Sequence, residues 1–218
     1  MIEFRDVEKH YDNNVIALDK INFTLKEGEV IVIKGVSGSG KSSILSLIAG
    51  LSKPTSGEVI VDKKHISKLA DHFACTYRRE NIGFVFQKYN LIPTLSVKDN
   101  ILLPLVPVNL KRSELESRLS EQLTLFNIEE KKDTLVKNLS GGEQQRVAIA
   151  RANINAPKII LADEPTANLD EKLSLEFIEM IKKMKSQKRT IVIATHDPLF
   201  FNLDFVDRVL NIENGKLL

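Results

Sequence analysis

The stretch GVSGSGKS at residues 35–42 matches the pattern G-x-x-x-x-G-K-[ST] of a phosphate-binding loop. An apolar run at residues 30–33 predicts a buried strand before the loop, and residues 43–49 predict a helix after it, with Gly50 as its stop. In this setting, glycines let backbone N–H groups converge on phosphates, and the helix N-terminus adds positive potential. The stretch therefore predicts a nucleoside triphosphate site in an α/β protein.

Two side chains of this loop have separate predicted roles. Lys41 would contact the β- and γ-phosphates, and the Ser42 hydroxyl would bind Mg²⁺. A glycine-rich turn without function would match the pattern in roughly one chain in a hundred, so we favour the nucleotide site. The residues of this region predicted to contact the nucleotide are Gly35, Ser37, Gly38, Ser39, Gly40, Lys41, Ser42 and Ser43.

A second apolar run, residues 159–162, ends in two carboxylates, Asp163 and Glu164. At the carboxyl end of a strand beside the phosphate-binding loop, Asp163 would bind Mg²⁺ directly or through water. Glu164 would then be placed to activate the attacking water. An acidic turn after a strand is common in proteins without such chemistry, so this assignment depends on the presence of the phosphate-binding loop.

Three further polar residues are weaker candidates when each is taken alone. Gln87 ends the apolar run GFVFQ, and its amide could contact metal-bound water and sense the γ-phosphate. His196 follows the strand-like residues 190–195 and could also reach the γ-phosphate. Tyr11 could stack on an adenine ring. A glutamine at a strand end is usually only a polar boundary, and a lone histidine there is usually a surface residue. These candidates therefore gain weight only from the motifs around them.

The composition is that of an ordinary globular protein. At 218 residues, the chain is long enough for one sizeable core with an inserted subdomain. The net charge of +2 is too small to indicate binding to nucleic acid, and we expect no such partner. No run approaches the roughly 18 apolar residues of a membrane helix, and the N-terminus lacks a signal peptide's apolar stretch. The single cysteine, Cys75, excludes an internal disulfide and fits a reducing cytoplasm. We expect any membrane role to come through a partner.

Two kinds of strand pattern indicate two sheets. Alternation at Ile2 and Phe4, at residues 21–25 and at residues 59–61 predicts a small antiparallel sheet near the N-terminus. Continuously apolar runs predict central parallel strands covered by helices on both faces. These runs are residues 30–33, 84–86, 159–162 and 191–194. Asn214-Gly215 predicts a hairpin between residues 209–212 and 216–218.

Three helices are predicted after residue 88. Ser113 and Glu116 have the spacing of a capping box, and a second helix should begin near Ser140 and run through residue 151. A third should follow Asp170. The apolar faces of the first and third helices consist of Leu115, Leu119, Leu123 and Phe126, and of Leu173, Phe177, Ile181 and Met184. We therefore expect a single domain, residues 1–218, with a core of residues 1–87 and 156–218 and a helical subdomain of residues 88–155.

The order of these motifs resembles that of the ATP-binding subunits of ABC transporters over essentially the whole chain. The motifs are Tyr11, the phosphate-binding loop, Gln87, LSGGEQQRVAIARA (residues 139–152), ILADEPT (160–166), ANLD (167–170) and THD (195–197). Ordinary P-loop kinases and GTPases lack the LSGGEQQR motif. The resemblance implies a P-loop NTPase (RecA-like) core with an N-terminal antiparallel β-subdomain and an inserted α-helical subdomain. It also implies ATP and Mg²⁺ as ligands and ATP hydrolysis as the reaction.

The resemblance also assigns roles to individual residues. The catalytic set would be Glu164, His196, Lys41 and Gln87, the Mg²⁺ ligands Ser42, Gln87 and Asp163, and the adenine-stacking residue Tyr11. Ser140, Gly141 and Gly142 would bind the γ-phosphate held by a second copy of the chain. Asp170 would be the D-loop aspartate and is assigned to the nucleotide-binding residues.

The physical chemistry of residues 140–143 agrees with the role assigned to Ser140. Ser140 and Glu143 have capping-box spacing, and the helix N-terminus they begin is an anion site without a local anion. If two chains docked head to tail, the helix N-terminus of each chain would face the phosphate bound by the other. The plain alternative is a structural helix cap.

Residues 83–105 look most like the branch of macrolide-efflux, lipoprotein-release and bacitracin-type peptide systems. This implies a homodimer bound to an integral-membrane permease, peripheral to the membrane on its cytoplasmic face. Tyr89, Leu91, Ile92 and Pro93 would contact that permease, or else pack within the helical subdomain. The alternative function is a force-transmitting or regulatory ABC ATPase that acts on an extracytoplasmic partner and transports nothing.

Overall fold

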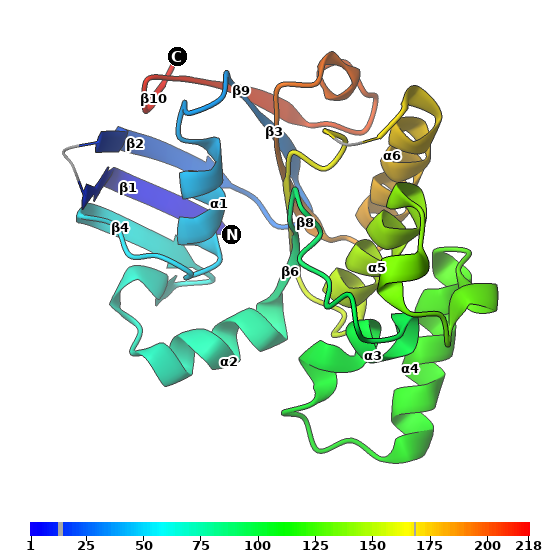
Figure 1. Cartoon of the computed structure of the whole chain (residues 1–218). Coiled ribbons are helices and arrows are strands. Elements are labelled where there is room, and N and C mark those ends of the chain that lie inside the picture. The colour runs from blue at the N-terminus through cyan, green and yellow to red at the C-terminus, as the bar shows by residue number, and fades with distance from the viewer. Residues whose placement is uncertain (13–14, 168) are drawn as a thin grey trace.

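The computed structural model describes residues 1–12, 15–167 and 169–218. Within these residues, a four-stranded sheet lies beside a six-stranded sheet, and a group of helices covers the far face of the larger sheet (Figure 1). This is the α/β architecture that the apolar runs and the alternating segments predict.

The larger sheet is parallel except at one edge. Its strands are β3 (Val30–Lys34), β6 (Ile82–Val85), β7 (Ile159–Asp163), β8 (Thr190–Thr195), β9 (Arg208–Glu213) and β10 (Lys216–Leu217). Their order is β10-β9-β3-β8-β7-β6, with β10 returning antiparallel to β9. Asn214 and Gly215 both have positive φ, as the hairpin predicted at this dipeptide requires.

The central strands are apolar throughout because both of their faces are buried. In β3, Val30 and Val32 pack in the core beneath the helices. Ile31 and Ile33 point to the other face and pack in the core formed with the small sheet. The prediction of parallel strands is confirmed, with bounds that differ by one residue at the ends of β3, β7 and β8 and by more at β6. The strand predicted at residues 84–86 is β6, which begins at Ile82 and ends at Val85, where its pairing with β7 stops.

The small sheet is antiparallel, as predicted from the alternating segments. Its strands are β1 (Ile2–Tyr11), β2 (Val15–Leu25), β4 (Ser56–Val61) and β5 (Lys64–His65), and their order among the described residues is β2-β1-β4-β5. Phe4 of β1 stacks on Phe23 of β2, with 4.5 Å between the ring centroids. The helix α1 (Lys41–Ile48) lies between this sheet and the larger one (Figure 1).

The far face of the larger sheet is covered by α5 (Gly141–Asn153) and α6 (Glu171–Ser186), and α3 (Val97–Leu102) and α4 (Arg112–Leu125) pack against α5. The capping box predicted at Ser113 and Glu116 is wrong. The N-cap of α4 is Lys111, two positions before Ser113, and no side chain caps the helix. The backbone N–H groups of residues 114 and 115 both donate to the Lys111 carbonyl, so Ser113 lies inside the first turn.

Two helices, α2 and α3, are absent from the sequence-based predictions. The helix α2 (Asp71–Asn81) packs beside β6, and its buried side chains are Ala74 and Tyr77. So few buried apolar positions give no helical periodicity that a sequence pattern could detect. The division of the chain into residues 1–87 and 156–218 against 88–155 stays a prediction. Among the described residues, no helix has both the length and the apolar character that a membrane span needs.

Candidate functional site

The phosphate-binding loop joins β3 to α1. At two of its positions only glycine fits, because a Cβ atom would clash with neighbouring backbone. A Cβ on Gly35 would lie 2.4 Å from the carbonyl oxygen of Ile212, and one on Gly40 would lie 2.4 Å from that of Ala17. Gly40 also has a φ of +109°, which L side chains rarely adopt. The loop is therefore held against β2 and against the C-terminal hairpin β9–β10.

Lys41 lies across the loop rather than out in solvent. Its ammonium group Nζ donates to the carbonyl oxygens of Gly35 at 2.7 Å and of Val36 at 3.0 Å. The same nitrogen lies 3.2 Å from Oε1 of Glu164, and only 5% of the Lys41 side chain is exposed. A buried ammonium held this way is a fixed positive charge at the mouth of the loop.

Ser42 and Asp163 bring two oxygen ligands together from α1 and the end of β7. The Ser42 hydroxyl donates to Oδ1 of Asp163 over 3.0 Å. Burial raises the pKa of the Asp163 carboxyl above its ordinary value, and the hydrogen bond from Ser42 opposes this only in part. A hydroxyl and a carboxylate side by side are hard oxygen donors of the kind that Mg²⁺ prefers, so these two residues fit the ion.

Glu164 follows β7 in a left-handed conformation, with a φ of +42°. Such strain needs support, and the backbone N–H of Glu164 provides it by donating to the Ala194 carbonyl of β8 at 2.8 Å. The carboxylate oxygen Oε2 accepts from Thr195 Oγ1 at 3.0 Å and from the backbone N–H of His196 at 3.3 Å, and His196 Nδ1 lies 3.0 Å away.

These contacts set the charge of Glu164. Burial on its own raises the pKa of the Glu164 carboxyl, but the interactions with His196 and Lys41 outweigh this, and the pKa lies below its ordinary value. Glu164 is therefore ionised at neutral pH and available as a proton acceptor. His196 has its side chain 68% exposed, so the imidazole also faces the open side of the site.

Lys41, Ser42, Glu164 and His196 border one cavity of about 350 Å³, together with other residues predicted from the sequence. Tyr11 stands at its rim, 44% exposed, with its hydroxyl 3.3 Å from Ser43 Oγ and the ammonium of Lys9 over its ring at 4.9 Å. The cavity is lined by Tyr11, Val15, Ala17, Ser37, Gly38, Gly40, Lys41, Ser42, Ser43, Gln87, Glu164 and His196. Gly35 and Ser39 lie in the same loop but do not line this cavity. Asp163 does not line it either, although it is hydrogen-bonded to Ser42, which does.

Three residues of the site were not found from the sequence. Val15 and Ala17 line the cavity from β2, and the apolar stretch just after Tyr11 was the available signal. Thr195 holds Glu164 from the end of β8 and also accepts from the backbone N–H of Asp197 at 3.0 Å. Its place in the THD motif, beside His196, is the sequence signal that points to it.

The remaining predicted residues lie elsewhere in the chain. Ser140 caps α5 in the predicted capping box: the Glu143 N–H donates to Ser140 Oγ at 3.3 Å, and the Ser140 N–H donates to Glu143 Oε2 at 2.8 Å. Asp170 caps α6 by accepting from the Leu173 N–H at 2.9 Å. Neither N-terminus lines the nucleotide cavity of its own chain. Asn168 of the ANLD motif lies outside the described residues.

Gly141 and Gly142, next to Ser140, differ in their surroundings. A Cβ on Gly142 would lie 2.7 Å from Leu173 Cδ2, so a larger residue here would require the Leu173 side chain of α6 to shift. A Cβ on Gly141 would meet nothing within 4 Å, and Gly141 is exposed. Packing within the chain therefore gives no reason for glycine at residue 141, and an external partner that approaches the helix N-terminus closely would give one.

Comparison with known proteins places these features in one family. The sequence model described as "ABC transporter" matches residues 18–167. An ABC transporter ATP-binding protein of Thermotoga maritima is 39% identical over all of this chain and 93% of its own length. The macrolide export ATP-binding/permease protein MacB of Campylobacter jejuni is also 39% identical, but this chain spans only 34% of that protein.

Solved structures agree with the sequence comparison. The dimeric, post-hydrolysis structure of the ATP-binding cassette MJ0796 with ADP and Pi superposes with a TM-score of 0.92, at 39% identity, over all of this chain and 96% of that one. The P-loop core with its antiparallel and helical additions is therefore that of an ATP-binding cassette, as the sequence predicts. With the phosphate-binding loop, the paired carboxylates and the capped LSGGEQQ helix, these likenesses show that the chain belongs to the ABC transporter family, as one of its ATP-hydrolysing, ATP-binding proteins.

Proposed function

We propose that this chain binds ATP with Mg²⁺ in the cavity beside Lys41, that two copies close around two ATP molecules, and that hydrolysis drives a membrane permease. The observation that carries the proposal is the exposed N-terminus of α5, which is built to bind an anion but does not line the cavity of its own chain. A head-to-tail pair would place it over the γ-phosphate of the other copy. The relative MJ0796 forms dimers in its solved structures.

Each part of the cavity has a distinct task in this proposal. The glycine-rich loop would hold the β-phosphate through its N–H groups, and Tyr11 would stack on the adenine. Lys41 would exchange the Gly35 and Val36 carbonyls for the γ-phosphate, moving a charge that is already at the loop. Ser42 and Asp163, with Gln87, would hold Mg²⁺, which when bound neutralises charge on the phosphate oxygens.

Proton transfer would fall to Glu164. Its carboxylate is ionised and fixed by Thr195 and His196, so it is oriented before ATP binds. It would take the proton of the water that attacks the γ-phosphate, while His196 keeps the carboxylate in place. Binding of ATP would also release Glu164 from Lys41, because the phosphates compete for the ammonium group.

Two tests follow directly from the two-copy site. The purified chain should hydrolyse ATP in the presence of Mg²⁺, with a rate per molecule that rises with protein concentration until the dimer saturates. A rate per molecule that stays constant down to the lowest concentrations, for a protein that sediments as a monomer with ATP, would contradict the proposal. Mg²⁺ removal by chelation should stop turnover, whereas activity that survives chelation would exclude the assigned Ser42 and Asp163 site.

The permease part of the proposal depends on the relatives named as ATP-binding/permease proteins, which combine both parts. We assign this chain the same branch, with a substrate that leaves the membrane or the cell, and a peripheral position on the cytoplasmic face. Tyr89 and Leu91 are half-buried, whereas Ile92 and Pro93 are exposed and available to a partner. Affinity purification of the tagged chain from detergent-solubilised native membranes tests this assignment. An integral-membrane permease should be recovered, and a preparation without one would contradict it.

A further inference from the structure

The ring of Tyr11, at the rim of the nucleotide cavity, is held by contacts with two other side chains. Its hydroxyl lies 3.3 Å from Oγ of Ser43, in the first turn of α1. The ammonium of Lys9 lies over the ring, 4.9 Å from its centroid. Because Tyr11 is 44% exposed, packing leaves much of the ring free, and these two contacts fix its orientation.

Lys9 is itself fixed, although it is only half-buried. Its Nζ donates to the carbonyl oxygen of Lys53 at 2.8 Å, in the loop between α1 and β4. Two more hydrogen bonds join this loop to β1, from the Thr55 N–H to the Glu8 carbonyl at 2.8 Å and from the His10 N–H to Thr55 Oγ1 at 2.9 Å. The ammonium is therefore held over the ring before a nucleotide binds, so binding does not have to order a free lysine side chain.

The ammonium covers the face of the ring that points away from the cavity. Tyr11 and Val15 line the nucleotide cavity, whereas Lys9 does not. Val15 pairs with Tyr11 across β1 and β2 and is 55% exposed, so an apolar side chain stands beside the ring on the cavity side. A planar base that enters the cavity meets the face of Tyr11 that Lys9 leaves open.

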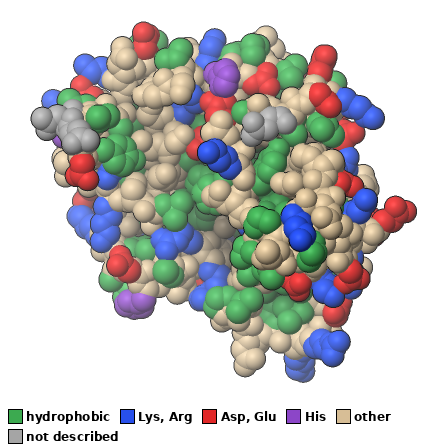
Figure 2. Space-filling view, viewed as in Figure 1, with side chains coloured by type: hydrophobic (Ala, Val, Ile, Leu, Met, Phe, Trp, Pro, Cys, Tyr) green, Lys and Arg blue, Asp and Glu red, His purple; other side chains and the backbone are tan. Residues whose placement is uncertain are grey.

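The charge of Lys9 acts on the ring rather than through a general positive field. Acidic and basic side chains are interspersed over the face of the molecule seen in Figure 2, and the net charge of the chain is only +2. A cation over an aromatic ring is attracted by the negative π face and draws its electron density towards itself. The opposite face becomes less negative, which favours stacking on an electron-rich purine.

We propose that Lys9 is a positioning residue for the nucleobase: its ammonium holds and polarises the Tyr11 ring, so that adenine stacks on the opposite face. The inference deepens the proposed function and rests on it, because it requires a nucleotide in the cavity beside Lys41. Lys9 contacts the ring and not the nucleotide. Its contribution should therefore depend on the base and be absent for a ligand made of phosphate alone.

The first experiment compares ADP with inorganic pyrophosphate, which lacks the nucleoside, by calorimetric titration of the full chain in Mg²⁺. Lys9→Met removes the charge and keeps an unbranched side chain. It should weaken ADP binding by about two- to fivefold, as expected for a cation over a ring at a partly exposed site, and leave pyrophosphate binding unchanged. Lys9→Arg should bind ADP more tightly than Lys9→Met, because a guanidinium keeps a cation over the ring.

Lys64→Met is the matched control, since it removes the same charge from an exposed site on β5 of the same sheet. It should bind both ligands like the unaltered chain. Equal ADP binding by Lys9→Met and the unaltered chain would overturn the inference. A loss of ADP and pyrophosphate affinity by the same factor in Lys9→Met would also overturn it, because that result indicates a disturbed phosphate-binding loop rather than a disturbed base site.

The second experiment asks whether Lys9 acts through Tyr11. Tyr11→Ala should weaken ADP binding by at least about fivefold, because it removes the stacking surface. Lys9→Met added to Tyr11→Ala should then cause no further loss, since the ring on which it acts is gone. Additive losses in the double variant would show that Lys9 acts on the nucleotide by another route, and the inference would be wrong.

Steady-state ATP hydrolysis separates this inference from the proposed function. Lys9→Met should raise the KM for ATP and leave kcat unchanged, because Lys9 does not line the cavity that holds the phosphates. A fall in kcat without a rise in KM would overturn the role in base positioning. If the unaltered chain neither binds ADP nor hydrolyses ATP, the proposed function is wrong. If it does both, and Tyr11→Ala weakens ADP binding while Lys9→Met behaves like the control, only the inference about Lys9 is wrong.

Discussion

Glu164→Gln replaces the proposed base with an amide of nearly the same shape. The amide oxygen can keep the contacts with Thr195 and His196, since both donate to Oε2. Its NH₂ group then takes the place of Oε1, 3.2 Å from the ammonium of Lys41. Two donors would face each other there, so the variant loses both the proton acceptor and the ion pair.

Loss of the proton acceptor should slow hydrolysis, whereas loss of the ion pair with Lys41 should not weaken ATP binding. Loss of a positioned general base lowers a reaction rate by about 10²–10⁴-fold. That range corresponds to about 3–5 kcal/mol of activation free energy. Nucleotide affinity should not fall, because in the unaltered chain ATP has to displace Glu164 from Lys41, and in the variant it does not. The variant should therefore bind ATP at least as tightly and turn it over far more slowly.

The assay is steady-state phosphate release with Mg²⁺ and saturating ATP, beside a fluorescence titration with ATP. The matched control is Glu176→Gln, the same chemical change at a carboxylate of α6 that also pairs with a cation, Arg146, but does not line the cavity. The control should lose no more than a small part of the rate. Turnover in Glu164→Gln within tenfold of the unaltered chain, or a fall in ATP affinity like that in its rate, would refute the assigned role of Glu164.

Two further predictions concern pH and stability. Asp163→Asn should abolish Mg²⁺-dependent turnover yet raise the melting temperature of the nucleotide-free protein at neutral pH, because burial raises the pKa of Asp163 above 3.8 and disfavours its ionised form. This gain in melting temperature should fade as the pH falls through the raised pKa, because Asp163 then becomes neutral in the unaltered chain as well. Thermal unfolding of both proteins across a range of pH measures the gain. A gain that grows towards acidic pH would contradict the prediction. Phe177→Ala should lower the unfolding free energy by about 3–5 kcal/mol, because Phe177 is fully buried and packs edge-on against Phe200 at 6.1 Å between ring centroids. Urea unfolding measures this loss, and a value below about 1 kcal/mol would show that the core under α6 is not packed as described.

The sequence predicts most of the fold because strong local signals agree with the packing. The continuously apolar strands are buried on both faces, and the alternating segments near Phe4 form the sheet that has one covered face. The caps at Ser140 and Asp170 could also be predicted, since each acts on a backbone N–H three residues away. The capping box predicted at Ser113 failed although its spacing is right, because α4 begins before Ser113.

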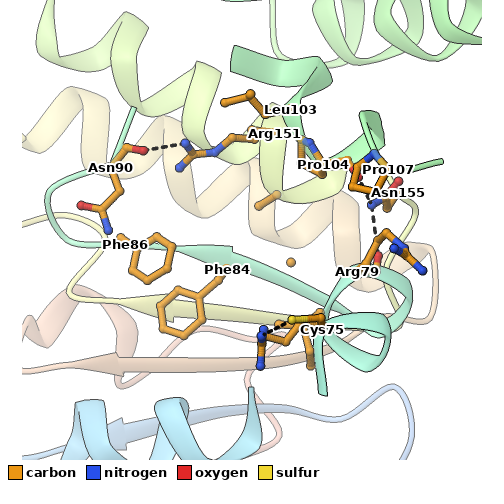
Figure 3. A pocket seen from close by; sticks show the side chains of 14 residues that line it. Cys75, Arg79, Phe84, Phe86, Asn90, Leu103, Pro104, Pro107, Arg151 and Asn155 are labelled. Carbon is orange, nitrogen blue, oxygen red and sulfur yellow. Dashed lines mark hydrogen bonds between the residues drawn. The ribbon is translucent and has the colours of Figure 1, made fainter. Parts of the chain in front are cut away.

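The features that sequence patterns missed depend on contacts between distant segments. The helix α2 has few buried apolar side chains and is fixed by packing beside β6. Thr195 acts on Glu164 only because β7 and β8 pair in register, and Val15 reaches the cavity only because β2 lies beside the loop. A cavity lined by Arg79, Phe84 and Pro107 (Figure 3) joins α2, β6 and the turn after α3, which are separate in sequence and meet only in the fold.

The most direct test of the two-copy site uses Gly141, where a side chain meets nothing within its own chain. Gly141→Asp, introduced into Glu164→Gln, places a negative charge at the exposed N-terminus of α5, where it should repel a phosphate held by the second copy. Ser113→Asp is the matched control, since it adds the same charge to the first turn of α4, at another exposed site.

Sedimentation velocity with Mg²⁺ and ATP is the measurement. Glu164→Gln, alone or with Ser113→Asp, should sediment at twice the chain mass of 24.6 kDa, and the variant with Gly141→Asp should remain at 24.6 kDa while still binding ATP. A Gly141→Asp variant that forms the ATP-bound dimer as readily as its control would contradict the account of a site completed by a second copy.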